Sequence, residues 1–121
     1  MEIDGYTISL NRGDEVTINI QNKENLPFMI GDIIKFSITK KGNMTDVLFQ
    51  KTFTVEEENN IFGILLTSDD TRFCPPLKQG FYTYWYEIEH NEITTLVGFD
   101  KEGGKEFIIY PEAIKAEESG E

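Results

Sequence analysis

Apolar and polar side chains alternate along most of this chain, and no other feature of the sequence restricts its fold so strongly. In the segment YTISLN, this alternation places Tyr6, Ile8 and Leu10 on one side of an extended backbone. The same period of two recurs in the segments 15–21, 33–40, 46–55 and 61–66. A period of two, bounded by turns such as KKGN, is typical of β-strands that are buried on one face.

The expected inner faces of these segments follow from the alternation. They comprise Val16, Ile18 and Ile20; Ile34, Phe36 and Ile38; Val47, Phe49, Phe53 and Val55; and Phe62, Ile64 and Leu66. About seven to nine short strands, spaced roughly 8–12 residues apart, predict an all-β, immunoglobulin-like antiparallel β-sandwich. A small β-barrel is the alternative. We expect residues 1–111 to form this single domain, and the polar, acidic residues 112–121 to form a flexible tail.

Two local features are expected between the strands. The segment TSDDTRF resembles one helical turn that Ser68 caps, with two aspartates at its N-terminus. The sequence KEGG is expected to join the last two strands, 93–100 and 105–111, into a closing hairpin, because its glycines can adopt positive φ.

The charge of the chain narrows the class of partner. With 11 basic and 22 acidic residues, the formal net charge is −11. Such a charge repels phosphate groups and so disfavours nucleic acids and anionic membranes as partners, whereas it suits a basic partner or simple solubility. The first residues, MEIDGYTISLN, contain no signal peptide, and no apolar run approaches the ~20 residues of a membrane span. We therefore expect synthesis in the cytoplasm without a cleaved export signal.

The residue types needed for catalysis or metal binding are scarce. Cys74 and His90 are the only cysteine and the only histidine, so an internal disulfide, a multi-cysteine metal site and a cysteine–histidine zinc cluster are not expected. Glu87 and Glu89 could in principle form a glycosidase pair, and the acidic turns SDD and DKEGG could offer oxygen ligands to calcium. Solvated carboxylates explain all three patterns more simply. The RGD sequence could be an adhesion motif, but a tight turn between two strands explains it without that role. We expect no enzymatic activity, no cofactor and no metal.

The segment GFYTYWYEIEH, residues 80–90, carries large rings on both faces of one predicted strand. The even-numbered side chains are Tyr82, Tyr84, Tyr86 and Ile88, whereas the odd-numbered set includes a threonine and two glutamates. Because carboxylates are costly to bury, the even-numbered set is expected to face the core. Tyr82 follows a glycine at the entrance to the strand, which is the position of a tyrosine corner, where the hydroxyl bonds to upstream backbone.

Two aromatic side chains are left on the outer face, Phe81 and Trp85. Three kinds of cover for them are considered: a loop of the same chain, another protein, or a sugar ring stacked on Trp85. Single exposed apolar groups are ordinary, but tryptophan is favoured as an anchor in protein interfaces. We expect an interface or ligand platform made by Phe81 and Trp85 and framed by Glu87, Glu89 and Lys35.

The order of these features is similar to that of a known group of proteins. The run YTISLNRGDEVTINIQNKENLPFMIGDIIKFSITKKGN resembles the opening of phage and prophage tail modules, in which a GD turn separates the first two strands. LLTSDDTRFCPPLKQGFYTYWYEIE resembles their second half, and TLVGFDKEGGKEFIIYPEA resembles the closing hairpin of small immunoglobulin-like prophage proteins of Gram-positive bacteria. The chain also resembles the N-terminal module of baseplate upper proteins.

The resemblance covers residues 6–113 and implies a non-enzymatic virion component of a phage or prophage tail or baseplate. Its partners would be a second copy of the chain or a neighbouring virion protein. The shared motifs are patterns of strands and turns, and no binding residue is carried over from the family. A carbohydrate-binding module that stacks sugars on the aromatic platform is the alternative. An intracellular regulator that caps another protein also fits the acidic charge.

Overall fold

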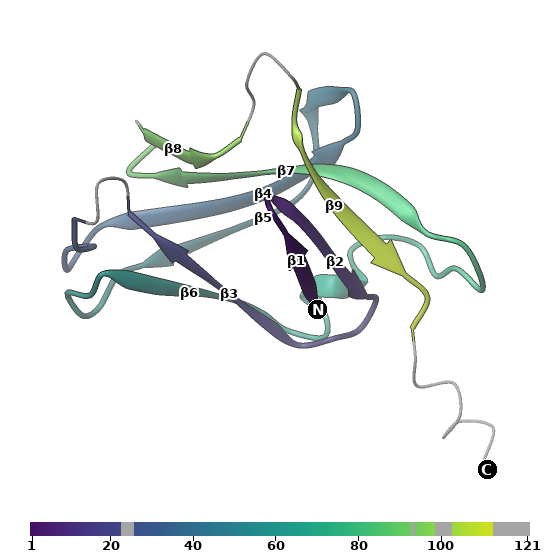
Figure 1. Cartoon of the computed structure of the whole chain (residues 1–121), viewed down its shortest axis with the longest axis horizontal. Coiled ribbons are helices and arrows are strands. Elements are labelled where there is room, and N and C mark those ends of the chain that lie inside the picture. Colours follow the sequence, from purple (N-terminus) through teal and green to yellow (C-terminus); the bar gives the residue numbers. More distant parts are fainter. Residues whose placement is uncertain (23–25, 93, 99–102, 113–121) are drawn as a thin grey trace, which may run out of the picture.

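The computed structural model describes residues 1–22, 26–92, 94–98 and 103–112, which form an all-β sandwich of two sheets (Figure 1). The large sheet contains β1 (Glu2–Asp4), β2 (Thr7–Asn11), β4 (Ile33–Lys40), β5 (Asn43–Thr54), β7 (Tyr82–His90), β8 (Thr94–Val97) and β9 (Lys105–Tyr110). The small sheet contains β3 (Val16–Gln21) and β6 (Ile61–Leu66). A 3-10 turn, η2 (Asp70–Arg72), lies between β6 and β7. The predicted all-β sandwich is confirmed.

The strand order follows the immunoglobulin plan. The large sheet has the order β1-β2-β9-β7-β4-β5, and the chain crosses between the sheets before and after both β3 and β6. β3 and β6 therefore hold the places of strands B and E, and β4, β7 and β9 hold those of C, F and G. β2 runs parallel to β9 in the large sheet, so the place of strand A beside β3 is not taken by the described N-terminal strands.

The expected closing hairpin is not formed as predicted. β8 and β9 both pair with β7, on the edge opposite β4: β8 along residues 88–90 and β9 along residues 82–86. β7 has nine residues, which is long enough to carry the two shorter strands one after the other. Residues 99–102, which include part of the KEGG sequence, lie outside the described residues.

The core lies between the two sheets and uses the predicted apolar faces. Its buried members include Ile8, Leu10, Ile18, Ile34, Phe36, Ile38, Ile64, Leu66, Tyr86, Ile88, Phe107 and Ile109. Phe36 packs its ring against Tyr86 and Phe107, which joins β4, β7 and β9 at the centre of the large sheet. Tyr82 and Tyr84 pack against the same core, so the even-numbered face of β7 points inward as predicted.

Two residues assigned to inner faces are exposed instead. Val47 pairs with Thr39, whereas Phe49 pairs with Ile38, so Leu48 is an extra residue in β5. This bulge reverses the phase of the strand and turns Val47 to the outer face. Tyr6 is exposed because it lies in the turn between β1 and β2, before the alternation of β2 begins.

The turn before β7 is capped by Thr67 rather than by Ser68. The Thr67 hydroxyl oxygen accepts a hydrogen bond from the Asp70 backbone N–H at 3.2 Å, and the Asp70 carboxylate accepts one from the Thr67 N–H at 2.9 Å. This exchange has the form of a capping box, which needs the polar pair three residues apart. Thr67 therefore makes the capping contact that was predicted for Ser68.

Candidate interaction surface

The outer face of β7 carries most of the predicted platform. Strand register places Trp85 beside Thr39, Glu87 beside Ser37 and Glu89 beside Lys35. The Lys35 ammonium lies 3.7 Å from the Glu89 carboxylate, and both side chains are partly exposed. An ion pair of this kind contributes little to stability. The structure thus brings Lys35, Trp85, Glu87 and Glu89 together on one sheet face.

Trp85 is half-buried, and the chain itself provides part of its cover. Gly104, just before β9, lies so close to the indole that a Cβ atom at this position would come within 2.4 Å of Cδ2. Gly103 is also adjacent, because a Cβ there would lie 3.7 Å from Cζ2. Intramolecular cover, the first of the three alternatives, therefore applies to one face of the ring.

Phe81 lies apart from this group, at the entrance to β7. It is 58% exposed, and its ring centroid lies 5.7 Å from that of Tyr110, which is 40% exposed. Ile108 lies between this pair and Trp85 on the same face, because it pairs with Thr83. We call Phe81, Trp85, Ile108 and Tyr110 the outer-face stripe.

Sequence reasoning missed the two members of the outer-face stripe that β9 supplies. Phe107 and Ile109 are buried, so the alternation in KEFIIY was sufficient to place Ile108 and Tyr110 on the opposite face. What the alternation could not show was that β9 pairs with β7, because a hairpin with residues 93–100 was expected.

The hydroxyl-to-backbone hydrogen bond expected of Tyr82 is made by Tyr86. The Tyr86 hydroxyl donates to the Tyr6 carbonyl, which ties β7 to the β1–β2 turn. Desolvation raises the pKa of the Tyr86 hydroxyl above its ordinary value, so the group remains a donor. In the described part of the chain, the Tyr82 hydroxyl makes no corresponding bond, and its ring packs beside Tyr84.

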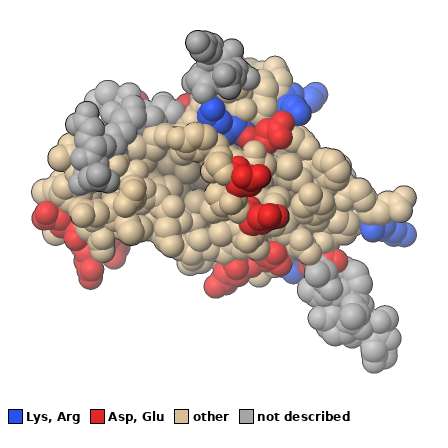
Figure 2. All heavy atoms as spheres, in the orientation of Figure 1, with Lys and Arg blue, Asp and Glu red and all other residues tan. Residues whose placement is uncertain are grey.

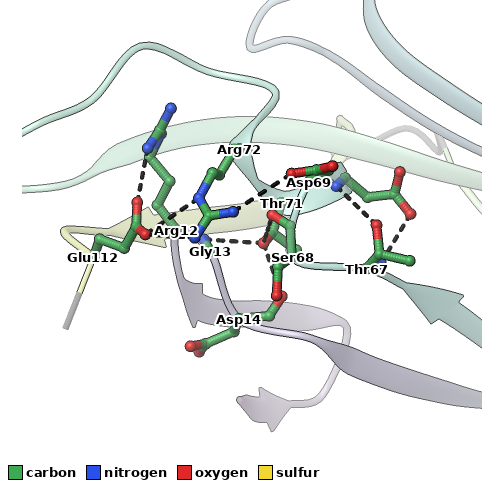
Figure 3. Close-up of polar contacts among 10 residues, drawn as sticks. Arg12, Gly13, Asp14, Thr67, Ser68, Asp69, Thr71, Arg72 and Glu112 are labelled. Atoms are coloured by element: carbon green, nitrogen blue, oxygen red, sulfur yellow. Dashed lines mark hydrogen bonds and ion pairs between the residues drawn. The ribbon is translucent and has the colours of Figure 1, made fainter. Parts of the chain in front are cut away.

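The RGD sequence is used inside the molecule, in a polar cluster at one end of the sandwich (Figure 3). Arg12 donates to Glu112 at 2.8 Å and to the Cys74 carbonyl at 2.9 Å. Arg72 donates to the other Glu112 oxygen at 2.8 Å, so two guanidinium groups hold one carboxylate. The Gly13 N–H donates to the Thr71 hydroxyl.

This arrangement favours a tight turn over an adhesion motif as the interpretation of RGD. The Arg12 side chain is only 14% exposed, so its guanidinium group is engaged and not presented to a receptor. Glu112, the first residue of the predicted flexible tail, is held in this cluster. Residues 113–121 lie outside the described residues.

His90 lies in a second polar group, at the end of β7. Its Nε2 atom is 2.7 Å from the Asp32 carboxylate, and its ring packs edge-on against Phe28. Asn91 adopts positive φ, donates to Asp32 and accepts a hydrogen bond from the Ile33 N–H, which joins the β7–β8 turn to β4. These contacts give the histidine a structural role.

The acidic turn SDD also has partners within the chain. Asp70 accepts a hydrogen bond from Lys51 at 2.6 Å, and Asp69 lies 3.5 Å from Arg72. Across the described ranges, no group of three or more histidine, cysteine, aspartate or glutamate side chains is placed to hold a metal ion. No described helix is long and apolar enough to cross a membrane.

Comparison of the chain with models of protein families, with curated proteins and with solved structures finds no match.

Proposed function

We propose that this chain is a non-enzymatic interaction module that binds another protein through the outer-face stripe. The observation that carries the proposal is the exposed aromatic pair, Phe81 and Tyr110, on the outer face of the large sheet. Tyrosine and tryptophan are enriched among the residues that dominate binding energy at protein interfaces, and phenylalanine is enriched at interface cores. Ile108 and the uncovered part of Trp85 continue the apolar surface, and Lys35, Glu87 and Glu89 supply a polar rim at one end.

The geometry favours a protein over a sugar as the ligand. The Gly104 backbone covers part of the Trp85 ring, which reduces the area left for a stacking sugar. Phe81 and Tyr110 have tilted rings, with an interplanar angle of 52°, so they do not present one continuous plane. A protein surface can fit both orientations because its side chains adapt to them.

The resemblance to phage and prophage tail modules suggests the setting. On that basis, we propose that the bound protein is a tail or baseplate protein, or a second copy of this chain in the virion. The sandwich topology is compatible with this proposal, and the strand and turn pattern of the sequence is its support.

The test compares two lysine variants at equally exposed apolar positions. Phe81→Lys places a charge in the stripe, whereas Leu26→Lys places one outside it; the two positions are 58% and 55% exposed. Each variant replaces the native chain in the strain that encodes it, and purified phage particles are analysed by mass spectrometry. We expect the native chain and Leu26→Lys at a copy number that matches the tail symmetry, and loss of Phe81→Lys.

Two outcomes would count against the proposal. Absence of the native chain from particles that contain other tail proteins would contradict a virion role. Trp85 is the only tryptophan, so its fluorescence reports on glycan binding to the same face. A change in this fluorescence on titration with cell-wall glycans, lost in Phe81→Lys, would assign the stripe to carbohydrate instead.

A further inference from the structure

A cleft of about 350 Å³ opens between the two sheets, on the face that Figure 2 shows. Its floor contains Tyr86 and Ile88, from the inward face of β7. Leu96 and Val97 of β8 line one side, and Ile3 of β1 lines another. The cleft is separate from the outer-face stripe, which lies on the opposite face of the large sheet.

The cleft follows the edge of β3. Four consecutive residues, 18–21, line it. Successive side chains of a strand point to opposite faces, so consecutive residues can share a cleft only where the cleft runs along the strand edge. Within the described ranges, β3 pairs with β6 alone, and its other edge therefore presents unpaired backbone groups to the cleft.

The two edges of the small sheet differ. At the β6 edge, Lys51 of β5 donates a hydrogen bond to the Leu65 carbonyl at 3.0 Å, and Phe53 packs against Phe62. No described segment gives the β3 edge such cover, and the sequence of β3, VTINIQ, contains neither charge nor proline. Charges and prolines are the usual means of blocking strand addition at a free edge. The vacant place beside β3 is also where strand A lies in the immunoglobulin sandwich.

We propose that this cleft accepts an extended, basic segment of a different protein, which adds to β3 as a third strand of the small sheet. In strand addition, backbone hydrogen bonds provide affinity and alternate side chains provide specificity. Apolar side chains at every second position of the segment would occupy the cleft above Tyr86 and Ile88. The intervening side chains would point away from the core and carry the positive charge.

Charge complementarity favours a basic segment of another protein over a second copy of this chain or its own C-terminal residues. The net charge is −11, so a second copy would bring like charge to the site. Residues 113–121 contain three glutamates and one lysine, which disfavours them for the same reason. Exposed Glu2 and Asp4 flank Ile3 on β1, and acidic groups lie near the middle of the face in Figure 2. One cation lies near these acidic groups, because the Lys105 ammonium lies over the ring of Tyr6, which lines the cleft.

The test uses a displayed library of random eight-residue peptides, selected on the purified native chain. Selected peptides are then measured against Ile3→Lys, which adds a cation at the cleft, and against Ile61→Lys, which adds one on β6 outside it. The two positions match, with exposures of 49% and 48%. We expect peptides that alternate apolar with basic residues, about tenfold weaker binding to Ile3→Lys, and native affinity for Ile61→Lys.

A second measurement locates the peptide. Hydrogen exchange of the β3 amides should slow when a selected peptide binds, because strand addition gives the free edge hydrogen-bond partners. Phe81→Lys should bind the peptide as the native chain does, so this test can fail without affecting the proposed role of the outer-face stripe. The proposal would be overturned if no peptide were enriched or if the enriched peptides were acidic. It would also be overturned if both lysine variants lost peptide affinity equally. A dimer that Ile3→Lys dissociates would assign the cleft to a second copy.

Discussion

The backbone of Gly104 lies so close to the indole ring of Trp85 that no side chain would fit at position 104. The contact joins the start of β9 to the centre of β7, where Trp85 pairs with Glu106. It explains why a large ring on the outer face of the sheet is only half exposed. A glycine is needed here for space, because a Cβ atom would overlap three atoms of the indole.

Gly104→Ala is therefore expected to lower the free energy of unfolding by about 1–3 kcal/mol, the usual cost of overpacking. Urea unfolding measures the change, and the emission of Trp85 should shift in the folded state because the ring must move. In a Trp85→Ala background the same alanine should cost much less. Equal costs in both backgrounds would show that the ring contact is not the cause.

The Glu112 carboxylate links two arginines that come from different parts of the chain. Glu112→Gln keeps the size of the side chain but removes the charge that faces Arg12 and Arg72. We expect the free energy of unfolding to fall by about 1–3 kcal/mol, because hydrogen bonds between charged groups are replaced by weaker ones. Thermal unfolding at low and high salt measures this loss. Glu57→Gln, at an exposed position, should change stability by less than about 0.5 kcal/mol.

Asp32 gives the fold a dependence on pH. A hydrogen bond from the Met29 N–H lowers the pKa of its carboxyl below the ordinary 3.8; burial opposes this, and contacts with His90 and Asn91 reinforce it. Because the pKa is lower in the folded state, ionised Asp32 stabilises the fold above pH 3.8, and this contribution is lost as the pH falls through the lower folded value. Asp32→Asn should thus be less stable than the native chain near neutral pH, and the difference should shrink in acid. Urea unfolding over a pH series tests this. An exposed control, Asp46→Asn, should change the free energy of unfolding at neutral pH by less than about 0.5 kcal/mol.

Cys74 is expected to be unreactive in the folded protein. Its side chain is buried, and burial raises the pKa of the thiol, so the reactive thiolate is scarce at neutral pH. A thiol-reactive dye should label the native chain only as fast as the chain unfolds, and at once in denaturant. Asn60→Cys, which adds a thiol at an exposed position, should label immediately. Rapid labelling of the native chain without denaturant would contradict the buried position.

The alternation of side chains predicted the faces of the strands well. It placed Ile18 and Ile20 in the core, and it turned Tyr86 and Ile88 inward while Trp85 stayed on the outer face. Alternation is a local property, however, and it contains no information on which strands are neighbours. For that reason β8 and β9 were expected to pair with each other, whereas both pair with β7.

The errors in the prediction have the same physical origin. The bulge at Leu48 depends on how β4 and β5 pair, so the reversal of phase at Val47 cannot be read from β5 alone. The cover of Trp85 by Gly104 follows from the approach of β9 to β7. The cleft beside β3 lies at an edge that no described strand occupies, and an unoccupied edge leaves no pattern in the sequence.

The position of β9 between β2 and β7 determines when the protein can fold during its synthesis. Ile8 pairs with a β9 residue, Phe107, near the opposite end of the sequence. The large sheet cannot close until Tyr110 has left the ribosome, because until then β2 and β7 lack the strand that joins them. Contacts between distant segments form slowly, and exposed strand edges aggregate. A nascent chain stalled before Lys105 would therefore present two open sheet edges and an uncovered core to chaperones and proteases.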